Sequence, residues 1–329
     1  MEFEKVSVVV PILNEEKYIA NFLDSLLSQD YPKDCLEIIL VDGNSDDKTR
    51  EIINLYLKKY DFIKLLENDK KTVQYAMNIG IKNSSGDYIV RMDAHAWYAS
   101  DYISKCIEYI KSVDAQNVGG PTVVKGKTHI QKIIAAAYSS PFALGGGKHY
   151  DPDFEGYCDT VSWGCFKKEY LMAIGMYDER LPRSEDDDLN LRISESGGKI
   201  FITPKIKSEY YPKESFSKLF KQYFNYGVWK IAVIKKHKKV PRISQLVPMA
   251  FAGFLVSFSL FSLFSKFFLV MLLLGLLLYM SVNLYFSFKS KSLKSFFDKI
   301  LLSWACFVIH FSYGLGFFKG VFKFMGSEW

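Results

Sequence analysis

The sequence has few cysteines and no glycine-rich phosphate loop. Its five cysteines among 329 residues show neither the paired spacing of a metal site nor a disulfide framework. No G-x-G-x-x-G or G-x-x-x-x-G-K-[ST] follows the first expected strand, "VSVVVPIL", which argues against dinucleotide oxidoreductases and P-loop nucleotidases. A nucleotide bound here needs another group to neutralise its phosphates, and a divalent metal would serve.

Net positive charge is concentrated in one short segment. The chain carries a net charge of +6, and residues 213–245 hold nine Lys or Arg against one Glu. The remainder is therefore slightly acidic, whereas nucleic-acid binding needs basic residues across a folded domain. A basic strip beside apolar segments favours an anionic membrane surface. We therefore expect a membrane, and no nucleic acid, among the partners.

Charged side chains are absent from two long runs near the C-terminus, residues 246–264 and 267–288. Each run is long enough to cross a bilayer as a helix. Basic residues before the first run and after the second place both outer ends on the cytosolic side. A third apolar run, 300–318, would put Lys319 and Lys323 outside if it crossed, so it either spans or lies shallow. The expected location is the plasma membrane, multi-pass, with the preceding domain cytosolic.

Between the two regions lies a basic segment with an apolar stripe at helical spacing. The stripe consists of Phe216, Leu219, Phe220, Tyr223, Phe224, Gly227, Ile231 and Ile234. We expect an amphipathic helix in the membrane interface, and the alternative is a core helix of the soluble domain. The predicted organisation is an α/β domain over 1–212, the basic helix and linker over 213–245, and two to three transmembrane helices over 246–329.

Residues 1–212 alternate strand and helix patterns. The strands read "VSVVVPIL", "LEIILVD", "DFIKLLEN" and "DYIVRMD", and helical patterns occupy 15–28, 46–58 and 72–82. Such β-α-β units predict a mostly parallel, Rossmann-like sheet, whose ligands bind beyond the carboxyl ends of the strands. Polar residues mark those ends, namely Asn14, Glu15, Asp42, Asp93 and His95.

The fourth strand runs directly into charge. Residues two apart in extended chain share a face, so Arg91, Asp93 and His95 point the same way. A carboxylate and an imidazole together could hold a divalent cation. The alternative is that Asp93 caps the following turn and His95 packs on Trp97.

Asp42, at the end of the second strand, allows two interpretations as well. Its carboxylate could accept a hydrogen bond from a nucleotide base or ribose. The alternative is a strand-end turn acid, with Ser45 capping the next helix.

Four consecutive acids, Glu185 to Asp188, form the last distinctive stretch. Ser184 could cap a helix whose first-turn acids complement the helix dipole. Crowded carboxylates also raise one another's pKa, which suits a general base. Arg192 lies one turn beyond Asp188 and could pair with it.

Four motifs in order carry a family resemblance: "VVVPILNEEKYI", "IILVDGNSDDKTREI", "NIGIKNSSGDYIVRMDAH" and "EDDDLNLRI". They resemble the family 2 glycosyltransferases, in particular the membrane-associated succinoglycan-biosynthesis glucosyltransferase type. The resemblance covers about residues 5–230 together with the C-terminal apolar segments. It implies a GT-A fold, a nucleotide-sugar donor such as a UDP-sugar, a divalent metal and inversion at the anomeric carbon. We expect the acceptor to be a hydroxyl of a lipid-linked saccharide.

The resemblance also implies roles for individual residues. The donor-binding positions are Pro11, Asn14, Glu15, Asp42 and Asp93. Asp93 and His95 fall on the D-x-D metal motif, with His95 replacing the second acid. An N/O ligand pair suits Mn²⁺ better than Mg²⁺. The catalytic base is Asp186, and the supporting residues of the pattern E-D-x-D-L-x-x-R are Glu185, Asp188 and Arg192.

Other functions remain open at this point. A polyprenyl-phosphate sugar transferase or a small processive β-glycan synthase would share the same motifs. "KQYFNYGVW" (221–229) lacks the Arg-Trp pair of the Q-x-x-R-W motif carried by processive synthases. A non-catalytic membrane scaffold would be expected to lack Asp93 or Asp186, and both are present.

Overall fold

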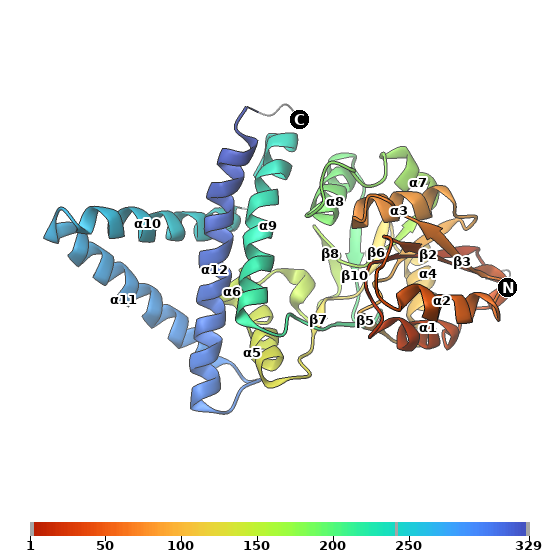
Figure 1. Cartoon of the computed structure of the whole chain (residues 1–329), viewed down its shortest axis with the longest axis horizontal. Coiled ribbons are helices and arrows are strands. Elements are labelled where there is room, and N and C mark those ends of the chain that lie inside the picture. The colour runs from red at the N-terminus through yellow and green to blue at the C-terminus, as the bar shows by residue number, and fades with distance from the viewer. Residues whose placement is uncertain (1–2, 241–242, 327–329) are drawn as a thin grey trace. The chain divides into compact units, whose positions relative to one another are not determined.

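The computed structural model describes residues 3–240 and 243–326, and the chain divides into two compact units (Figure 1). Unit 1 comprises Met1–Val123 and Asp151–Tyr210, and unit 2 comprises Val124–Tyr150 and Tyr211–Trp329. Residues 124–150, assigned from sequence to the 1–212 domain, therefore group with the C-terminal region. The reason is helix α5 (His129–Tyr138), which is largely buried and packs against the C-terminal helix α12 (Phe296–Phe324).

An eight-stranded sheet forms the centre of unit 1, in the order β3-β2-β1-β4-β9-β6-β10-β8. Its strands are β1 (Val6–Ile12), β2 (Leu36–Asp42), β3 (Ile63–Glu67), β4 (Tyr88–Arg91), β6 (Asn117–Gly119), β8 (Gly156–Cys158), β9 (Cys165–Lys167) and β10 (Ile200–Ile202). Strands β1 to β4 are parallel, while β9 runs antiparallel between β4 and β6. A smaller sheet joins β5 (Ala96–Tyr98), β11 (Ser208–Tyr210) and β7 (Val123–Val124).

Alternate side chains of the central strands enter separate hydrophobic cores on the two faces of the sheet. Val8 and Val10 lie in one core, and Val9 with Ile39 in the other. The covering helices are α1 (Ile19–Leu27), α2 (Thr49–Leu57), α3 (Val73–Lys82), α4 (Tyr102–Ser112), α7 (Lys168–Ala173) and α8 (Glu185–Glu195). This confirms the predicted Rossmann-like α/β fold with a mostly parallel sheet.

Two helices begin later than the sequence pattern predicts. The patterns started at residues 15 and 46, whereas α1 begins at Ile19 and α2 at Thr49. The difference arises because the residues after β1 and β2 hydrogen-bond to each other across the two loops. These loops form part of the candidate site described below.

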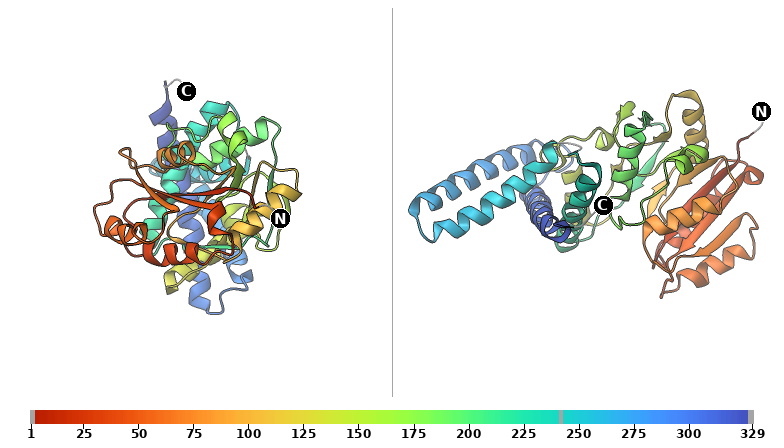
Figure 2. Two further views of the ribbon diagram at one scale, coloured as in Figure 1. Left: turned by 90° about the vertical axis from the view of Figure 1, so that its right-hand side faces the viewer. Right: turned by 90° about the horizontal axis from the view of Figure 1, so that it is seen from above.

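Unit 2 is helical. Its helices are α5, α6 (Pro141–Leu144), α9 (Phe216–His237), α10 (Val247–Ser262), α11 (Lys266–Lys289) and α12, with short 3-10 turns at Lys148–Tyr150 and Ile243–Leu246. Three helices of the described residues are long and apolar enough to span a membrane, over Ser244–Ser262, Lys266–Lys289 and Phe296–Phe324. Helices α10 and α11 project as a hairpin from the rest of the unit (Figure 1 and the right view of Figure 2).

The apolar stripe of α9 is covered by protein along part of its length. A Cβ atom at Gly227 would lie 2.1 Å from the carbonyl oxygen of Tyr313, so α9 approaches α12 at backbone distance. Tyr223 packs edge-on against Tyr138 of α5, with ring centroids 6.2 Å apart. Leu219, Tyr223, Gly227 and Ile231 of this stripe are therefore buried within unit 2, whereas Phe216, Phe220, Phe224 and Ile234 stay partly exposed.

Candidate active site

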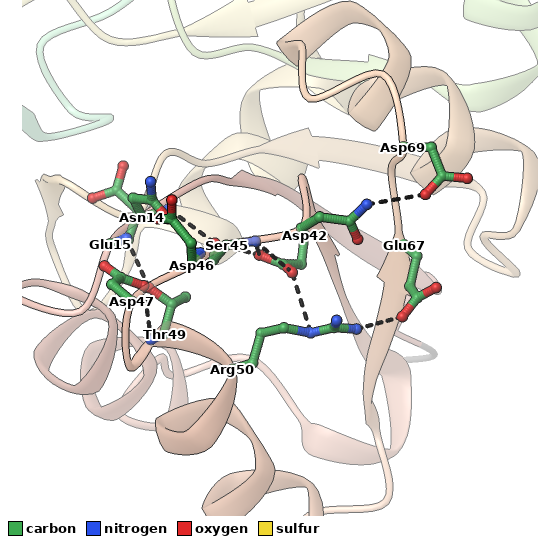
Figure 3. Close-up of polar contacts among 11 residues, drawn as sticks. Asn14, Glu15, Asp42, Ser45, Asp46, Asp47, Thr49, Arg50, Glu67 and Asp69 are labelled. Atoms are coloured by element: carbon green, nitrogen blue, oxygen red, sulfur yellow. Dashed lines mark hydrogen bonds and ion pairs between the residues drawn. The ribbon is translucent and has the colours of Figure 1, made fainter.

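The loops after β1 and β2 interlock through backbone hydrogen bonds (Figure 3). The Asn14 N–H donates to Ser45 Oγ at 2.9 Å, and the Asp46 N–H donates to Asn14 Oδ1 at 3.0 Å. The Glu15 N–H donates to Thr49 Oγ1 at 2.8 Å. Asn14 has a left-handed backbone (φ 57°), which asparagine tolerates better than most residues. The carboxyl ends of the two strands are thus joined by Asn14 and Glu15.

Asp42 is fully buried beneath these loops. Its carboxylate accepts a 2.5 Å hydrogen bond from Ser45 Oγ and lies 3.2 Å from Nε of Arg50 (Figure 3). Arg50 also reaches Glu67 at the end of β3, at 2.5 Å. The prediction that Ser45 caps the next helix is wrong, because α2 starts after Lys48 and Ser45 bonds to Asp42 instead.

The charged end of β4 meets the first loop through a histidine–carboxylate contact. His95 Nδ1 lies 2.9 Å from Oε1 of Glu15. The two oxygens of Asp93 are engaged by Nε of Arg91 at 3.3 Å and by the indole N–H of Trp163 at 2.9 Å. The turn after Asp93 is closed by its backbone carbonyl, which accepts from the Ala96 N–H, so the Asp93 side chain is not the turn cap.

Asp93 and His95 could supply two ligands to a divalent cation, whose remaining ligands would not come from protein side chains. Burial raises the pKa of Asp93, but the Arg91 guanidinium and the hydrogen bond from the Trp163 indole hold the pKa below its usual value, so the carboxylate is ionised. A carboxylate on Nδ1 of His95 makes Nε2 the ring nitrogen with a lone pair. Across the described residues no group of three or more His, Cys, Asp or Glu could hold a metal. A cation here would complete its shell with phosphate oxygens and water.

The acidic stretch opens helix α8 and carries the second half of the site. Asp186 is partly buried, and desolvation with repulsion from Glu185 and Asp187 raises its pKa to about 7. Ser184 stands at the N-cap position of α8, as predicted, but its side chain makes no capping hydrogen bond. Ser184 instead has a left-handed backbone (φ 60°), whereas a capping serine is normally extended. Such strain in a non-glycine residue is typical of functional sites.

The predicted pair of Asp188 and Arg192 is confirmed. Arg192 Nε lies 2.9 Å from Oδ2 of Asp188, which is fully buried. The same guanidinium donates to the carbonyls of Ile174 at 2.6 Å and Met176 at 2.5 Å. Arg192 therefore ties α8 to the loop that follows α7.

Arg91 joins the two halves of the site. Its buried guanidinium contacts Asp93 and lies 3.4 Å from Oε1 of Glu185, the first residue of α8. The sequence placed Arg91 on the face of Asp93 but gave it no role. A buried arginine at a strand end requires carboxylate partners, so the sequence could have predicted an ion pair for Arg91. Trp163 had no comparable signal, because an indole donor on Asp93 depends on tertiary packing.

A buried amide network holds α8 against the loop that carries Trp163. Asn190 donates to Thr160 Oγ1 at 2.9 Å and to the carbonyl of Val161 at 3.2 Å, and accepts from Asn117 Nδ2 at 3.1 Å. A Cβ atom at Gly164 would lie 2.1 Å from Oδ1 of Asn117, so only glycine fits there. The network fixes α8 relative to the loop of Trp163, whose indole N–H donates to Asp93.

Removing this network should lower stability. Asn190→Leu leaves the buried Asn117 amide without its partner, and we expect the free energy of unfolding of the intact protein to fall by about 1–3 kcal/mol. Thermal unfolding in detergent measures it. The control is Asn54→Leu at an exposed position of α2, which should change little. Equal melting temperatures for both variants would show that the network is not stabilising.

The fold and these two carboxylate sets define an enzyme of the glycosyltransferase class, and comparison with known proteins agrees. The family model described as "Glycosyl transferase family 2" matches residues 7–160. A Methanococcus voltae protein, "Dolichyl N-acetyl-alpha-D-glucosaminyl phosphate 3-beta-D-2,3-diacetamido-2,3-dideoxy-beta-D-glucuronosyltransferase", is 31% identical over 330 residues, 97% of each chain. "Succinoglycan biosynthesis protein ExoA" from Rhizobium meliloti (strain 1021) is 30% identical over 247 residues, 74% of each. The chain belongs to glycosyltransferase family 2.

A solved structure supports the fold. "Mannosyltransferase PcManGT from Pyrobaculum calidifontis in complex with GDP-Man and Mn2+" aligns with a TM-score of 0.66 at 18% identity. The alignment covers 98% of this chain and 88% of that one. The expected GT-A fold followed by apolar C-terminal helices is thereby confirmed.

Proposed function

We propose that this glycosyltransferase moves a hexose-type sugar from a nucleotide-sugar donor, a UDP-sugar, to a hydroxyl of a lipid-linked saccharide, with inversion at the anomeric carbon. The observation that carries the proposal is the bridge made by Arg91. It joins Asp93, on the donor side, to Glu185, beside the candidate base Asp186. A group that binds the leaving diphosphate and a group that accepts a proton are therefore close enough to act on one sugar.

On the donor side, the interlocked loops supply the pocket for the nucleotide. Pro11, Asn14, Glu15 and Asp42 would bind the donor there, and the buried Asp42 also holds Ser45 and Arg50. Asp93 and His95 would hold a divalent cation, Mn²⁺ or Mg²⁺, which neutralises the diphosphate leaving group as the glycosidic bond breaks. Glu15 orients His95 for that task.

On the acceptor side, Asp186 takes the proton from the attacking hydroxyl. A pKa of about 7 is well matched to a base at neutral pH. The oxygen attacks the anomeric carbon from the face opposite the departing diphosphate, which inverts its configuration. Asp188 and Arg192 hold the helix that carries the base.

The relatives support a lipid-linked acceptor. The Methanococcus protein is named for transfer to a dolichyl phosphate-linked sugar, and the Rhizobium protein for succinoglycan biosynthesis. Two exposed apolar helices in unit 2 are consistent with an acceptor presented at a membrane. We therefore place the reaction at the cytosolic face of the plasma membrane, in the synthesis of an exopolysaccharide or another surface glycan.

Purified full-length protein incubated with a panel of nucleotide sugars and Mn²⁺ tests the proposal. We expect nucleotide diphosphate release from one donor to increase several-fold when a polyprenyl-linked saccharide is added, with a product one sugar longer. Nucleotide diphosphate release at the same rate with and without the polyprenyl-linked saccharide would contradict the proposed acceptor class. A ladder of long products would favour a processive synthase, and a polyprenyl-phosphate product without an existing saccharide would favour the sugar-phosphate transferase.

The transfer rate should depend on pH through Asp186. A protonated carboxyl cannot accept the acceptor proton, so the rate should be low at pH 5.5, rise as pH passes about 7 and level off above it. Because the folded-state pKa is raised, the stability contributed by this carboxyl has the opposite trend and is lost as pH rises through 7. A pH–rate profile of transfer measures the first effect. A rate that is flat from pH 5.5 to 8.5 would rule out Asp186 as the titrating group.

The intact protein should remain with membranes after an alkaline carbonate wash. Helices α10 and α11 expose large apolar side chains such as Leu263, Leu273 and Leu277, which no domain of this size could hide. A protein bound only by its basic strip would be released, because that attraction is electrostatic. Immunoblots of pellet and supernatant measure the fraction of protein that stays with the membranes. Recovery of the chain in the supernatant would contradict membrane insertion.

A further inference from the structure

The three candidate spans of unit 2 differ in how much protein covers them. In the most apolar stretch, 11% of α10 and 11% of α11 is buried, against 61% of α12. Helices α10 and α11 are therefore open around most of their surface, as lipid-inserted helices are. Helix α12 is covered along one side by α9, α5 and α10.

The C-terminal end of α12 lies beside the basic end of α9. Lys235 Nζ donates to the carbonyl of Phe324 at 2.5 Å, and Lys323 Nζ lies 4.1 Å from the centroid of the Trp229 ring. Basic clusters of this kind stay on the cytosolic side of a membrane. The end of α12 therefore shares that side with the end of α9.

The N-terminal end of α12 follows another basic segment. The loop after α11 reads "SKSLKS" (290–295) and falls on the cytosolic side by the same rule. Both ends of α12 are then on one side, although the helix has 29 residues and would reach across a bilayer if it stood upright.

The least buried apolar residues of α12 form a stripe that recurs every three or four positions. Phe297, Ile300, Trp304 and Phe322 are exposed, Phe307, Phe311, Leu315 and Phe318 are partly exposed, and Met325 continues the stripe just beyond the helix. Lys319 and Lys323 are exposed near the C-terminal end. The Phe307 ring also lies 6.2 Å from that of Phe251 in α10 and from that of Tyr279 in α11. The middle of the stripe thus lies beside both helices of the α10–α11 hairpin, which projects from α12 (Figure 1).

We propose that α12 does not cross the membrane but lies in its plane, with this stripe immersed in the cytosolic leaflet. One apolar face and one covered face, with Lys299, Lys319 and Lys323 near the ends, is the pattern of an interfacial helix on anionic lipid. Among the described residues, the hairpin α10–α11 is then the part that enters the bilayer core. The inference deepens the proposed membrane attachment and rests on it.

Spin labels at three positions of the stripe test the orientation in the full-length protein, reconstituted in vesicles of phosphatidylglycerol and phosphatidylcholine. Ile300→Cys, Phe311→Cys and Phe322→Cys span about 33 Å along the helix axis. The background replaces the partly exposed Cys35 and Cys158 by serine. Leu277→Cys, exposed near the middle of α11, is the deep control. Depth is measured from the accessibility of each label to oxygen and to a water-soluble nickel complex.

We expect equal, shallow depths for the three α12 labels and a much deeper Leu277 label. A Phe311 label as deep as Leu277, with Ile300 and Phe322 shallow, would mean that α12 spans and would overturn the inference. A Leu277 label in water would instead overturn the membrane attachment itself.

Sidedness gives an independent measurement in the same background. A membrane-impermeant maleimide applied to sealed vesicles should label Met325→Cys only from the side that labels Lys59→Cys, an exposed position of unit 1. Labelling of the two variants from opposite sides would place the C-terminal end of α12 across the membrane and contradict an in-plane helix.

Discussion

Replacing Asp186 by asparagine should reduce sugar transfer by roughly a hundredfold or more, which is the usual contribution of a positioned general base. Asparagine keeps the size and the hydrogen bonding of the side chain but cannot take a proton. Affinity for the donor should change little, because Asp93 and the interlocked loops are intact. Steady-state transfer kinetics and donor titration calorimetry measure the two effects separately.

The matched control for this substitution is the neighbouring acid. Asp187→Asn removes one charge from the same turn of α8 and should cost far less activity, since Asp187 has no assigned proton transfer. Asp187→Asn also removes one source of the raised pKa of Asp186, so its pH–rate profile should shift towards lower pH. Equal and small losses in both variants would mean that the cluster only supports a helix start, and the base would lie elsewhere.

Removing the divalent cation should abolish transfer and weaken donor binding, because the diphosphate would leave without a neutralising charge. Excess chelator should reduce turnover to background, and Mn²⁺ should restore it at least as well as Mg²⁺. His95→Ala should raise the concentration of metal needed for half-maximal activity. Metal titrations of donor binding measure this without relying on turnover.

The contact between Glu15 and His95 allows a second, independent prediction about metal affinity. Glu15→Gln leaves both proposed ligands in place but removes the carboxylate on His95, so metal affinity should fall about tenfold to a hundredfold. Glu16→Gln, at the exposed neighbouring position, is the control and should be near wild type. Full turnover in chelator, or identical metal affinities for the two variants, would contradict the metal site.

The sequence predicted the α/β fold and the strand ends that carry the site because both depend on local periodicity. Buried strands and amphipathic helices repeat at different intervals, and polar residues interrupt the pattern where strands end. The candidates Asp93 and His95 could be located in this way, whereas the choice of Asp186 among four consecutive acids came from the family resemblance. The pair of Asp188 and Arg192 was equally accessible, since i,i+4 contacts follow from helix geometry alone.

Contacts between residues distant in sequence could not be predicted from local periodicity. Ser45 bonds to Asp42 instead of capping a helix because the loop after β1 pulls it towards Asn14. The 124–150 segment belongs with the membrane-associated unit because α5 packs on α12, which lies more than a hundred and fifty residues later. The donation of Trp163 to Asp93 likewise joins segments 70 residues apart. No local pattern records such pairings.

The most direct test of the account is the anomeric configuration of the product. Intact protein in Mn²⁺ would be given an α-linked nucleotide sugar and a lipid-linked acceptor, and the new linkage would be read by NMR spectroscopy. Attack opposite the leaving diphosphate, assisted by Asp186, predicts a β-linked product that the Asp186→Asn variant fails to form. An α-linked product, or a β-linked product formed equally fast by that variant, would contradict the mechanism.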